Sequence, residues 1–287
     1  MLNQRFLSSI VLISILVAIL MVSHTPMGWL VPLVLALLSV QGIREFVEMA
    51  ERKGLTIQKE TLFTGTLIYF FGLYALRASK VFSPSLLDSA FIFILLFFFF
   101  VVEGIKKQYG ENNLSTFKSF ITSFAAFIYV PWCLGFTMKI LYFFENSSVF
   151  KNTLGLQFVI FLFLVSKGTD IFAYWIGKNY GKHKLVDKIS PQKTMEGCLG
   201  GLVGATLLAL ISQQVYLTEL SILQALIFGF AVSFVSQVGD LAESLLKRDT
   251  SCKDSGSLIY GFGGILDLLD SILFAAPFLY FLMCFFF

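Results

Sequence analysis

The strongest candidates for chemistry are acidic residues that lie inside or at the edge of long apolar stretches. They are Asp170, Asp240, Glu243, Asp267 and Asp270. If these stretches cross a membrane, each exposed charge costs roughly 2.5–3.5 kcal/mol at the bilayer centre. We therefore expect the carboxylates to face one another, a cavity or cations. For any one of them, a structural role at a solvated helix end is the alternative.

The spacing of these acids places them on shared helix faces. Asp240, Glu243 and Lys247 stand at i, i+3 and i+7, which puts them on one stripe of a helix. Asp267 and Asp270 are related by i, i+3 on the next apolar stretch. The pattern predicts two neighbouring helices that each present carboxylates on one face.

A basic, glycine-rich segment connects these two helices. It holds Arg248, Lys253, Asp254, Gly256, Gly261, Gly263 and Gly264, and Lys247 directly precedes it. Glycines let a backbone approach a ligand, and the N–H groups at the start of the next helix favour an anion. Lys and Arg suit phosphates, and Mg²⁺ can bridge carboxylate and phosphate oxygens that would otherwise repel one another. The residue types predict metal-assisted phosphate chemistry, with an intramembrane ion-translocation site as the alternative.

The elements that position these residues must be membrane helices. The chain has 287 residues, of which 57% are hydrophobic and 14% charged, and its mean hydropathy is +0.82. Soluble chains carry about 25% charged and about 45–50% apolar residues. The 34 Phe residues alone would make a water-exposed surface too apolar for a soluble monomer. The composition excludes an ordinary soluble domain and predicts an all-α, polytopic integral membrane protein.

Nine apolar stretches are long enough to span a bilayer at roughly 20 residues per span. They cover residues 6–23, 28–49, 60–78, 86–103, 117–142, 153–176, 196–215, 222–247 and 260–284. Lys and Arg are concentrated at the N-terminus and after the even-numbered stretches, whereas the other side holds only Arg77, Lys80, Lys139 and Lys151. Because positive charge marks the cytoplasmic side, we expect about nine transmembrane helices with a cytoplasmic N-terminus.

We expect one integral membrane domain over residues 1–287, with mainly scaffold helices in 1–150 and the catalytic region in 165–275. The four Cys residues lie far apart without a CxxC pair, so neither a zinc site nor a disulfide framework is expected. The net charge of +3 is too small to indicate a nucleic-acid partner.

The order of these residues resembles the signature of the phosphatidate cytidylyltransferases (CDP-diacylglycerol synthases). One match begins Gly239-Asp240-Leu-x-Glu243-Ser244-Leu-Leu-Lys247-Arg248 and continues as x4-Lys253-Asp254-x-Gly256-x4-Gly261-x-Gly263-Gly264-Ile-Leu-Asp267-x-x-Asp270. An upstream match reads Asp170-x-x-Ala173-Tyr174-x-x-Gly177-Lys178-x-x-Gly181-Lys182, followed by Ser190-Pro191-x-Lys193-Thr194-x-Glu196-Gly197. The motifs cover roughly residues 170–270, and nine helices with a basic cytoplasmic face suit the family elsewhere.

The resemblance implies that a phosphatidate oxygen attacks the α-phosphorus of CTP to give CDP-diacylglycerol and pyrophosphate. It implies CTP, phosphatidate and membrane lipids as partners, and Mg²⁺ as cofactor with room for a second cation. The implied metal ligands are Asp240, Asp267 and Glu243. The implied catalytic residues are Lys247, Arg248, Lys253, Asp254 and the supporting Asp270. The implied substrate-binding residues are Lys193, Ser190, Gly261, Gly263 and Gly264.

The chain departs from the family pattern at three positions. Phe262 stands where His is usual, Tyr260 where Pro is usual, and Leu268 where Arg usually follows the aspartate. Losing His removes a proton shuttle or phosphate donor, and losing Arg removes a fork-shaped phosphate contact. Because phosphoryl transfer depends mainly on positioning and charge neutralisation, we still expect activity.

Two other functions stay open from the sequence. A CTP-dependent polyprenol or phytol kinase would transfer the γ-phosphate and release CDP. An ion-coupled transporter would use Asp170, Asp240 and Asp267 as a relay, but the acids crowd into the C-terminal part instead of recurring in inverted repeats. We expect a bacterial inner-membrane enzyme whose active site faces the cytoplasm, and a homodimer remains open.

Overall fold

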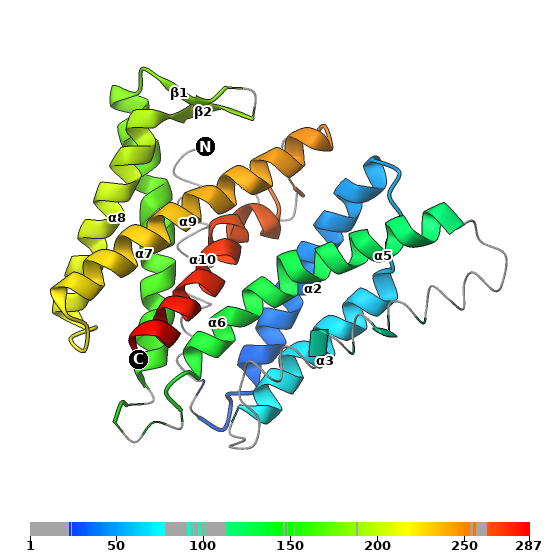
Figure 1. The fold of residues 1–287 in the computed structure, drawn as a ribbon, viewed down its shortest axis with the longest axis horizontal. Helices are drawn as coiled ribbons and strands as arrows, with labels where there is room; N and C mark the ends of the chain where they lie inside the picture. The colour runs from blue at the N-terminus through cyan, green and yellow to red at the C-terminus, as the bar shows by residue number, and fades with distance from the viewer. Residues whose placement is uncertain are drawn as a thin grey trace. The chain divides into compact units, whose positions relative to one another are not determined.

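The computed structural model describes most of the chain, and almost all of its regular structure is helical (Figure 1). The described residues are 25–77, 113–145, 149–151, 153–187, 189–252, 255–256 and 263–287, with Ser23, Ser147 and isolated residues between 91 and 101. They form two compact units. Unit 1 comprises residues 1–139 and 254–267, and unit 2 comprises residues 140–253 and 268–287.

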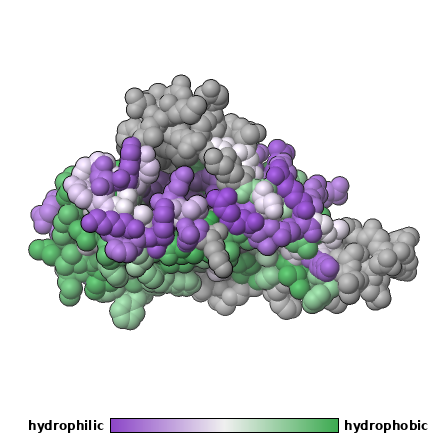
Figure 2. All heavy atoms as spheres, turned by 90° about the horizontal axis from the view of Figure 1, so that it is seen from above, coloured by the Kyte–Doolittle hydropathy of each residue, from purple (hydrophilic) through white to green (hydrophobic). Residues whose placement is uncertain are grey.

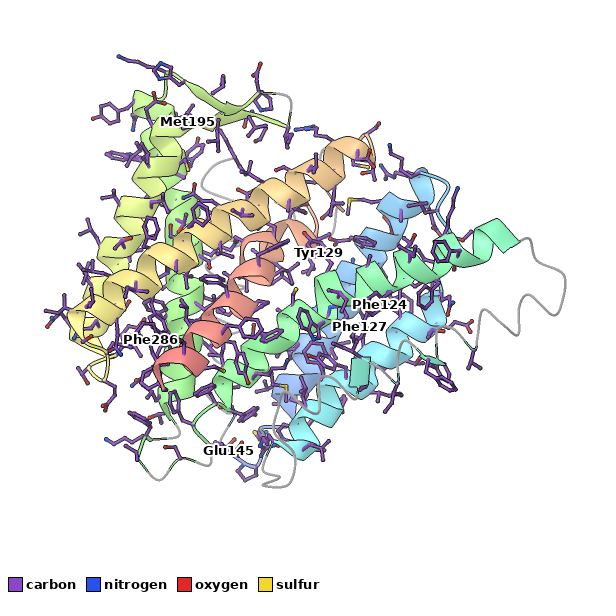
Figure 3. The ribbon with its side chains drawn as sticks, in the orientation of Figure 1. Phe124, Phe127, Tyr129, Glu145, Met195 and Phe286 are labelled. Atoms are coloured by element: carbon purple, nitrogen blue, oxygen red, sulfur yellow. The ribbon has the colours of Figure 1, made fainter. Side chains whose placement is uncertain are left out.

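Unit 1 is a helical unit with an aromatic core. Its helices are α2 (Leu30–Arg52), α3 (Lys59–Leu76), α5 (Asn113–Phe127) and most of α6 (Cys133–Leu141). Tyr69 and Phe127 are buried, and their ring centroids lie 5.6 Å apart. Phe46 and Tyr129 pack with their centroids 6.0 Å apart. Figure 3 labels Phe127 and Tyr129 among the side chains of this unit. These ring contacts bury apolar area between α3 and α5 and between α2 and the turn that follows α5.

A π-helical turn, η1 (Ile128–Trp132), joins α5 to α6 without a loop and contains Pro131. Proline lacks an N–H, and its ring clashes with the carbonyl four residues earlier, so a regular α-helix is interrupted there. A single wider turn accommodates such an interruption. The result is one apolar stretch, Phe117–Leu141, which is long enough to cross a membrane. The predicted single stretch at 117–142 is confirmed.

Unit 2 combines long helices with a small hairpin. Its elements are α7 (Thr153–Tyr180), β1 (Lys184–Val186), β2 (Ser190–Thr194), α8 (Met195–Val215), α9 (Ile222–Asp249) and most of α10 (Ile265–Phe286). The two strands pair antiparallel and connect α7 to α8, which lie side by side (Figure 1). Thr194 caps α8, since its hydroxyl accepts a hydrogen bond from the N–H of Gly197 at 3.1 Å. The all-helical prediction did not include this hairpin.

Glycines allow α7 and α8 to approach closely. A Cβ at Gly197 would lie 2.6 Å from the carbonyl oxygen of Ala173, and one at Gly201 would lie 3.1 Å from that of Thr169. Gly197 and Gly201 are four residues apart, a spacing typical of close helix packing in membranes. The α7–α8 pair therefore depends on the absence of side chains at this seam.

Replacing Gly197 by Ala is expected to destabilise the protein by about 1–3 kcal/mol, because the added methyl group has no room between the helices. Gly72 in α3 is a matched control, since a Cβ there would meet nothing within 4 Å. Alanine at position 72 is expected to be neutral or slightly stabilising. Thermal unfolding in detergent micelles compares the two variants, and equal melting temperatures would contradict the close packing at Gly197.

Six helices among the described residues are long and apolar enough to cross a membrane. They are Leu30–Arg52, Phe117–Leu141, Thr153–Tyr180, Met195–Val215, Ile222–Asp249 and Ile265–Phe286. The predicted stretch 60–78 is present as the helix α3, whereas 6–23 and most of 86–103 lie outside the described residues. Figure 2 shows hydrophilic residues (purple) gathered above hydrophobic ones (green), the separation expected where helices leave the hydrocarbon. The chain is an integral membrane protein.

Candidate active site

In unit 1, the carboxylate of Glu45 on α2 holds the start of α10. Glu45 is only 2% exposed. Its Oε1 accepts a hydrogen bond from the N–H of Ile265 at 2.8 Å. Its Oε2 accepts from the N–H of Leu266 at 2.8 Å and from the hydroxyl of Ser255 at 2.9 Å. The first N–H groups of a helix lack partners within the helix and carry partial positive charge, so this buried carboxylate satisfies and is stabilised by them.

Asp267 lies in the first turn of α10, and its carboxylate contacts residues that precede this helix. Its Oδ2 accepts hydrogen bonds from the N–H of Ser255 at 2.9 Å and of Gly264 at 2.8 Å, and the Ser255 hydroxyl lies 2.9 Å away. Gly264 makes this possible, because a Cβ there would overlap Oε2 of Glu45. Gly263 has a φ of 105°, in the region that favours glycine. Gly263 and Gly264 therefore shape the turn that precedes Asp267.

Replacing Glu45 by Ala is expected to lower the stability of the protein by about 1–3 kcal/mol, because buried N–H groups at the start of α10 lose their acceptor. Glu48, on the same helix, is exposed and provides a matched control. Glu48→Ala is expected to change stability by less than about 0.5 kcal/mol. Melting temperatures in one detergent compare the variants, and equal losses would show that Glu45 has no special role.

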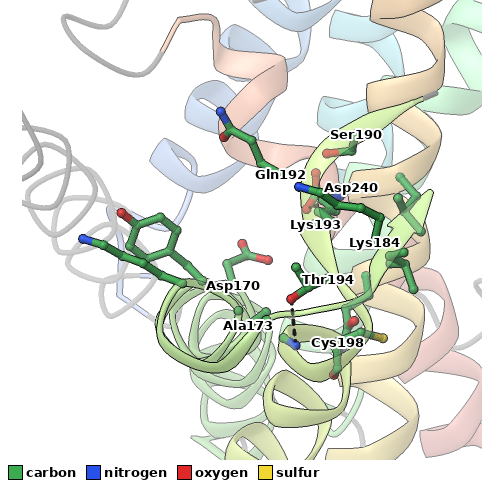
Figure 4. Close-up of a pocket in the computed structure, with 17 residues that line it drawn as sticks. Asp170, Ala173, Lys184, Ser190, Gln192, Lys193, Thr194, Cys198 and Asp240 are labelled. Atoms are coloured by element: carbon green, nitrogen blue, oxygen red, sulfur yellow. Dashed lines mark hydrogen bonds and ion pairs between the residues drawn. The ribbon is translucent and has the colours of Figure 1, made fainter. Parts of the chain in front are cut away.

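Unit 2 contains a cavity of about 680 Å³ that is lined by the hairpin and by α7, α8 and α9 (Figure 4). Its charged lining residues are Asp170, Lys178, Lys184, Lys193 and Asp240. Its uncharged polar lining residues include Ser190, Gln192, Thr194 and Gln237. The cavity therefore gathers three residues that the sequence assigned to the site, namely Ser190, Lys193 and Asp240.

An ion pair between β2 and α9 faces this cavity. Lys193 Nζ lies 2.7 Å from Asp240 Oδ2, and each side chain is more than a quarter exposed. Gly239, next to Asp240, allows α9 to approach α10, because a Cβ there would lie 2.7 Å from the carbonyl oxygen of Asp270. The strand thus supplies a cation and the helix a carboxylate to the lining of the cavity.

A second group of charges joins α7 to α10. Lys167 Nζ donates to the hydroxyl of Ser271 at 2.9 Å and to Asp170 Oδ2 at 3.3 Å, and it lies 3.8 Å from Asp270 Oδ1. Asp270 Oδ1 also accepts a hydrogen bond from the N–H of Ser271 at 2.5 Å. As expected for carboxylates inside apolar helices, Asp170 and Asp270 have a cationic neighbour.

Sequence reasoning missed Lys167 and Glu45, although both gave a signal. Each is a charged residue inside an apolar stretch, and a lysine is as unusual there as an acid. A search for every charge within the predicted spans would have found both residues.

Glu243 and Lys247 form a separate pair on α9. Glu243 is fully buried, and its Oε2 accepts a hydrogen bond from Lys247 Nζ at 2.9 Å. Arg248 Nε donates to the carbonyl oxygen of Ile189 at 3.0 Å. These contacts stabilise the end of α9 and fix it to the hairpin, beside the strand that carries Lys193.

The residues that the sequence assigned to the site divide between the two units. Unit 2 holds Ser190, Lys193, Asp240, Glu243, Lys247, Arg248 and Asp270, and unit 1 holds Gly263, Gly264 and Asp267. Lys253, Asp254 and Gly261 lie outside the described residues, as do Tyr260 and Phe262. Leu268, the third departure from the family pattern, is 8% exposed and buried in unit 2.

The chemistry of the cavity suits a divalent cation that is shared with phosphates. Asp170 and Asp240 both line it, and Mg²⁺ usually takes one or two carboxylates together with phosphate oxygens and water. In the part of the chain that the structure describes, no group of three or more His, Cys, Asp or Glu side chains is arranged to hold an ion by itself. Asp240 fits best among the residues predicted to bind metal, since its carboxylate is partly exposed in the cavity.

Comparisons with known proteins place the chain in a family. A model of the cytidylyltransferase family matches residues 3–286. A phosphatidate cytidylyltransferase of Haemophilus influenzae is 33% identical over 97% of each chain, and one of Synechocystis is 29% identical over 97% of this chain and 95% of the relative. One of Bacillus subtilis is 41% identical over 61% of this chain and 62% of the relative. With matches that run along nearly its whole length, this protein belongs to the cytidylyltransferase family, as its resemblance to the phosphatidate cytidylyltransferases predicted.

Proposed function

We propose that this protein transfers the cytidylyl group of CTP to phosphatidate, forming CDP-diacylglycerol and pyrophosphate in phospholipid biosynthesis. The family match over residues 3–286 carries the proposal. Three relatives that align with the chain have the name phosphatidate cytidylyltransferase. The cationic and acidic lining of the cavity in unit 2 suits substrates that are both phosphates.

In the proposed reaction, an oxygen of the phosphatidate phosphate forms a bond to the α-phosphorus of CTP. The bond between this phosphorus and the bridging oxygen breaks, and pyrophosphate leaves. Because a phosphate monoester has a second pKa of about 6, phosphatidate is largely dianionic at neutral pH, and its attack needs no general base. Phe262, whose side chain cannot donate or accept a proton, is therefore compatible with the reaction.

The cations of the chain would hold the phosphates. We expect Lys193 to exchange Asp240 for phosphate oxygens when the nucleotide enters, with Ser190 beside it on β2. Lys247 and Arg248 at the end of α9, together with Lys253 and Asp254 in the following loop, would complete the phosphate contacts. Gly261, Gly263 and Gly264 would let the loop backbone approach the substrate.

We retain Asp240, Asp267 and Glu243 as the proposed metal ligands, with Asp270 in support. Mg²⁺, when bound, would neutralise charge on the phosphate oxygens and on the departing pyrophosphate. The structural observation that supports Asp240 as a ligand is its partly exposed carboxylate in the cavity. The proposal includes a second cation, which the same family resemblance implies.

The proposal includes a topology and a location. The distribution of Lys and Arg supports nine helices with a cytoplasmic N-terminus, of which six candidate spans lie among the described residues. We place the site at the cytoplasmic face of a bacterial inner membrane. Residues 1–150 would be scaffold and 165–275 the catalytic region of a single integral membrane domain, which is compatible with a homodimer.

The test of this function uses purified protein in vesicles that contain phosphatidate, with CTP labelled at either the α- or the γ-phosphate. We expect the α-label to enter the lipid and the γ-label to appear in pyrophosphate, with both dependent on phosphatidate. Entry of the γ-label into lipid would indicate a lipid kinase. An absence of any labelled lipid would overturn the proposed function.

A further inference from the structure

Lys167 is a charged residue in an apolar helix, and it is surrounded by acids. It lies in α7, within the candidate span Thr153–Tyr180, and its side chain is 17% exposed. A charge in such a helix is costly unless polar partners compensate it. Compensation here comes from two helices that are distant in the sequence, α7 and α10.

The ammonium group of Lys167 makes two hydrogen bonds and one longer ion pair. Its Nζ donates to the hydroxyl of Ser271 at 2.9 Å and to Oδ2 of Asp170 at 3.3 Å, and it lies 3.8 Å from Oδ1 of Asp270. The Ser271 hydroxyl also lies 3.5 Å from Asp170 Oδ2. One ammonium therefore fixes a carboxylate of α7 relative to a carboxylate of α10.

The same ammonium acts on charges at the cavity. Asp170 lines the cavity together with Asp240 and Lys193. The charge of Lys167 attracts those of Asp170, Asp240 and Asp270, and these three carboxylates repel one another. Without the ammonium, Asp170 and Asp270 would repel each other. They would be expected to move apart or to become protonated.

We propose that Lys167 is a positioning residue for cytidylyl transfer, because it holds Asp170, which lines the cavity proposed to receive the phosphates, in a fixed place relative to Asp270 on α10. The inference rests on the proposed function, since it names a residue that acts on the same site. Lys167 is not assigned a contact with substrate. Its effect reaches the reaction through the two carboxylates.

The first test replaces Lys167 by Ala and measures kcat and KM for CTP in phosphatidate vesicles. Partners that orient a metal-binding or catalytic group are typically worth about 10- to 100-fold in activity, so we expect a loss of that size, mainly in kcat. Methylammonium fits the space of the missing ammonium and is expected to restore part of kcat saturably. Tetramethylammonium at equal ionic strength cannot donate hydrogen bonds and is expected to restore nothing.

Lys139 provides a matched control, because it is another buried lysine of an apolar helix and its ammonium lies 3.7 Å from the centroid of Phe136. Lys139→Ala is expected to keep the parent kcat and to show no response to methylammonium. A Lys167→Ala variant with the parent kcat would overturn the inference. So would equal restoration by the two amines.

A double variant covers the case in which Lys167→Ala does not fold. Lys167→Met with Asp170→Asn removes one cation and one carboxylate, so no unpaired charge is left from this pair. We expect its melting temperature to approach that of the parent while kcat stays low, and full activity would contradict the positioning role.

An inactive parent protein would overturn the proposed function instead. Methylammonium is still expected to raise the melting temperature of Lys167→Ala, a result that does not depend on activity.

Discussion

Replacing Asp240 by Asn is expected to reduce CDP-diacylglycerol formation by about 100-fold or more, which is the order of effect for a preorganised electrostatic group at a reacting phosphate. Asn has nearly the same size as Asp, so the change removes a negative charge and little else. That charge is partly exposed in the cavity and lies 2.7 Å from Lys193 Nζ. Its loss would remove a ligand of the proposed divalent cation and leave Lys193 without its carboxylate.

The stability of the Asp240→Asn protein is expected to change by less than about 1 kcal/mol, because partly exposed ion pairs contribute little to folding. Asp249 lies at the end of the same helix and is exposed, so Asp249→Asn is a matched control that should keep the parent rate. The rate of CTP-dependent lipid formation in vesicles is the measurement. A parent-like rate in Asp240→Asn would remove Asp240 from the site.

Replacing Asp267 by Asn is expected to have an effect of similar size, about 100- to 1,000-fold on the rate. Its Oδ2 accepts hydrogen bonds from the N–H groups of Ser255 and Gly264. The amide oxygen of Asn can accept the same bonds, so the turn is expected to persist while the charge is lost. The prediction therefore separates the electrostatic role of Asp267 from its part in shaping the loop.

Ser255→Ala tests the loop without touching the carboxylate. It removes the hydroxyl that lies 2.9 Å from both Glu45 Oε2 and Asp267 Oδ2. We expect a loss of about 1 kcal/mol in stability and a much smaller loss of rate than in Asp267→Asn. Equal losses of rate in the two variants would mean that Asp267 acts only by shaping the turn.

The membrane helices could be predicted from the sequence because the signal is local. A run of apolar residues reports a span wherever it occurs, and even the interruption at Pro131 lies inside the stretch predicted at 117–142. The hairpin at residues 184–194 could not be found in this way, since β1 has only three residues and the five residues of β2 are mostly polar. Its pairing depends on backbone contacts that hydropathy does not record.

The site was only partly predictable because helical periodicity gives a direction but not a neighbour. Asp240 and Glu243 share a stripe of α9, yet Asp240 pairs with Lys193 of β2 and Glu243 with Lys247 of its own helix. Glu45 contacts backbone groups more than 200 positions away in the sequence. Gly264, predicted to let the backbone approach a ligand, packs against Glu45. Such long-range partners are set by tertiary packing, which no local pattern encodes.

The most direct test of the proposed metal site is the rate of CDP-diacylglycerol formation as a function of free Mg²⁺, measured for the parent protein, Asp240→Asn and Asp267→Asn. We expect a saturable dependence in the parent and no activity in EDTA. We also expect that each variant loses most of its rate at every Mg²⁺ concentration or needs far more Mg²⁺ to recover it. Unchanged activity in EDTA, or parent-like Mg²⁺ curves in both variants, would contradict the proposal that these carboxylates act through a divalent cation.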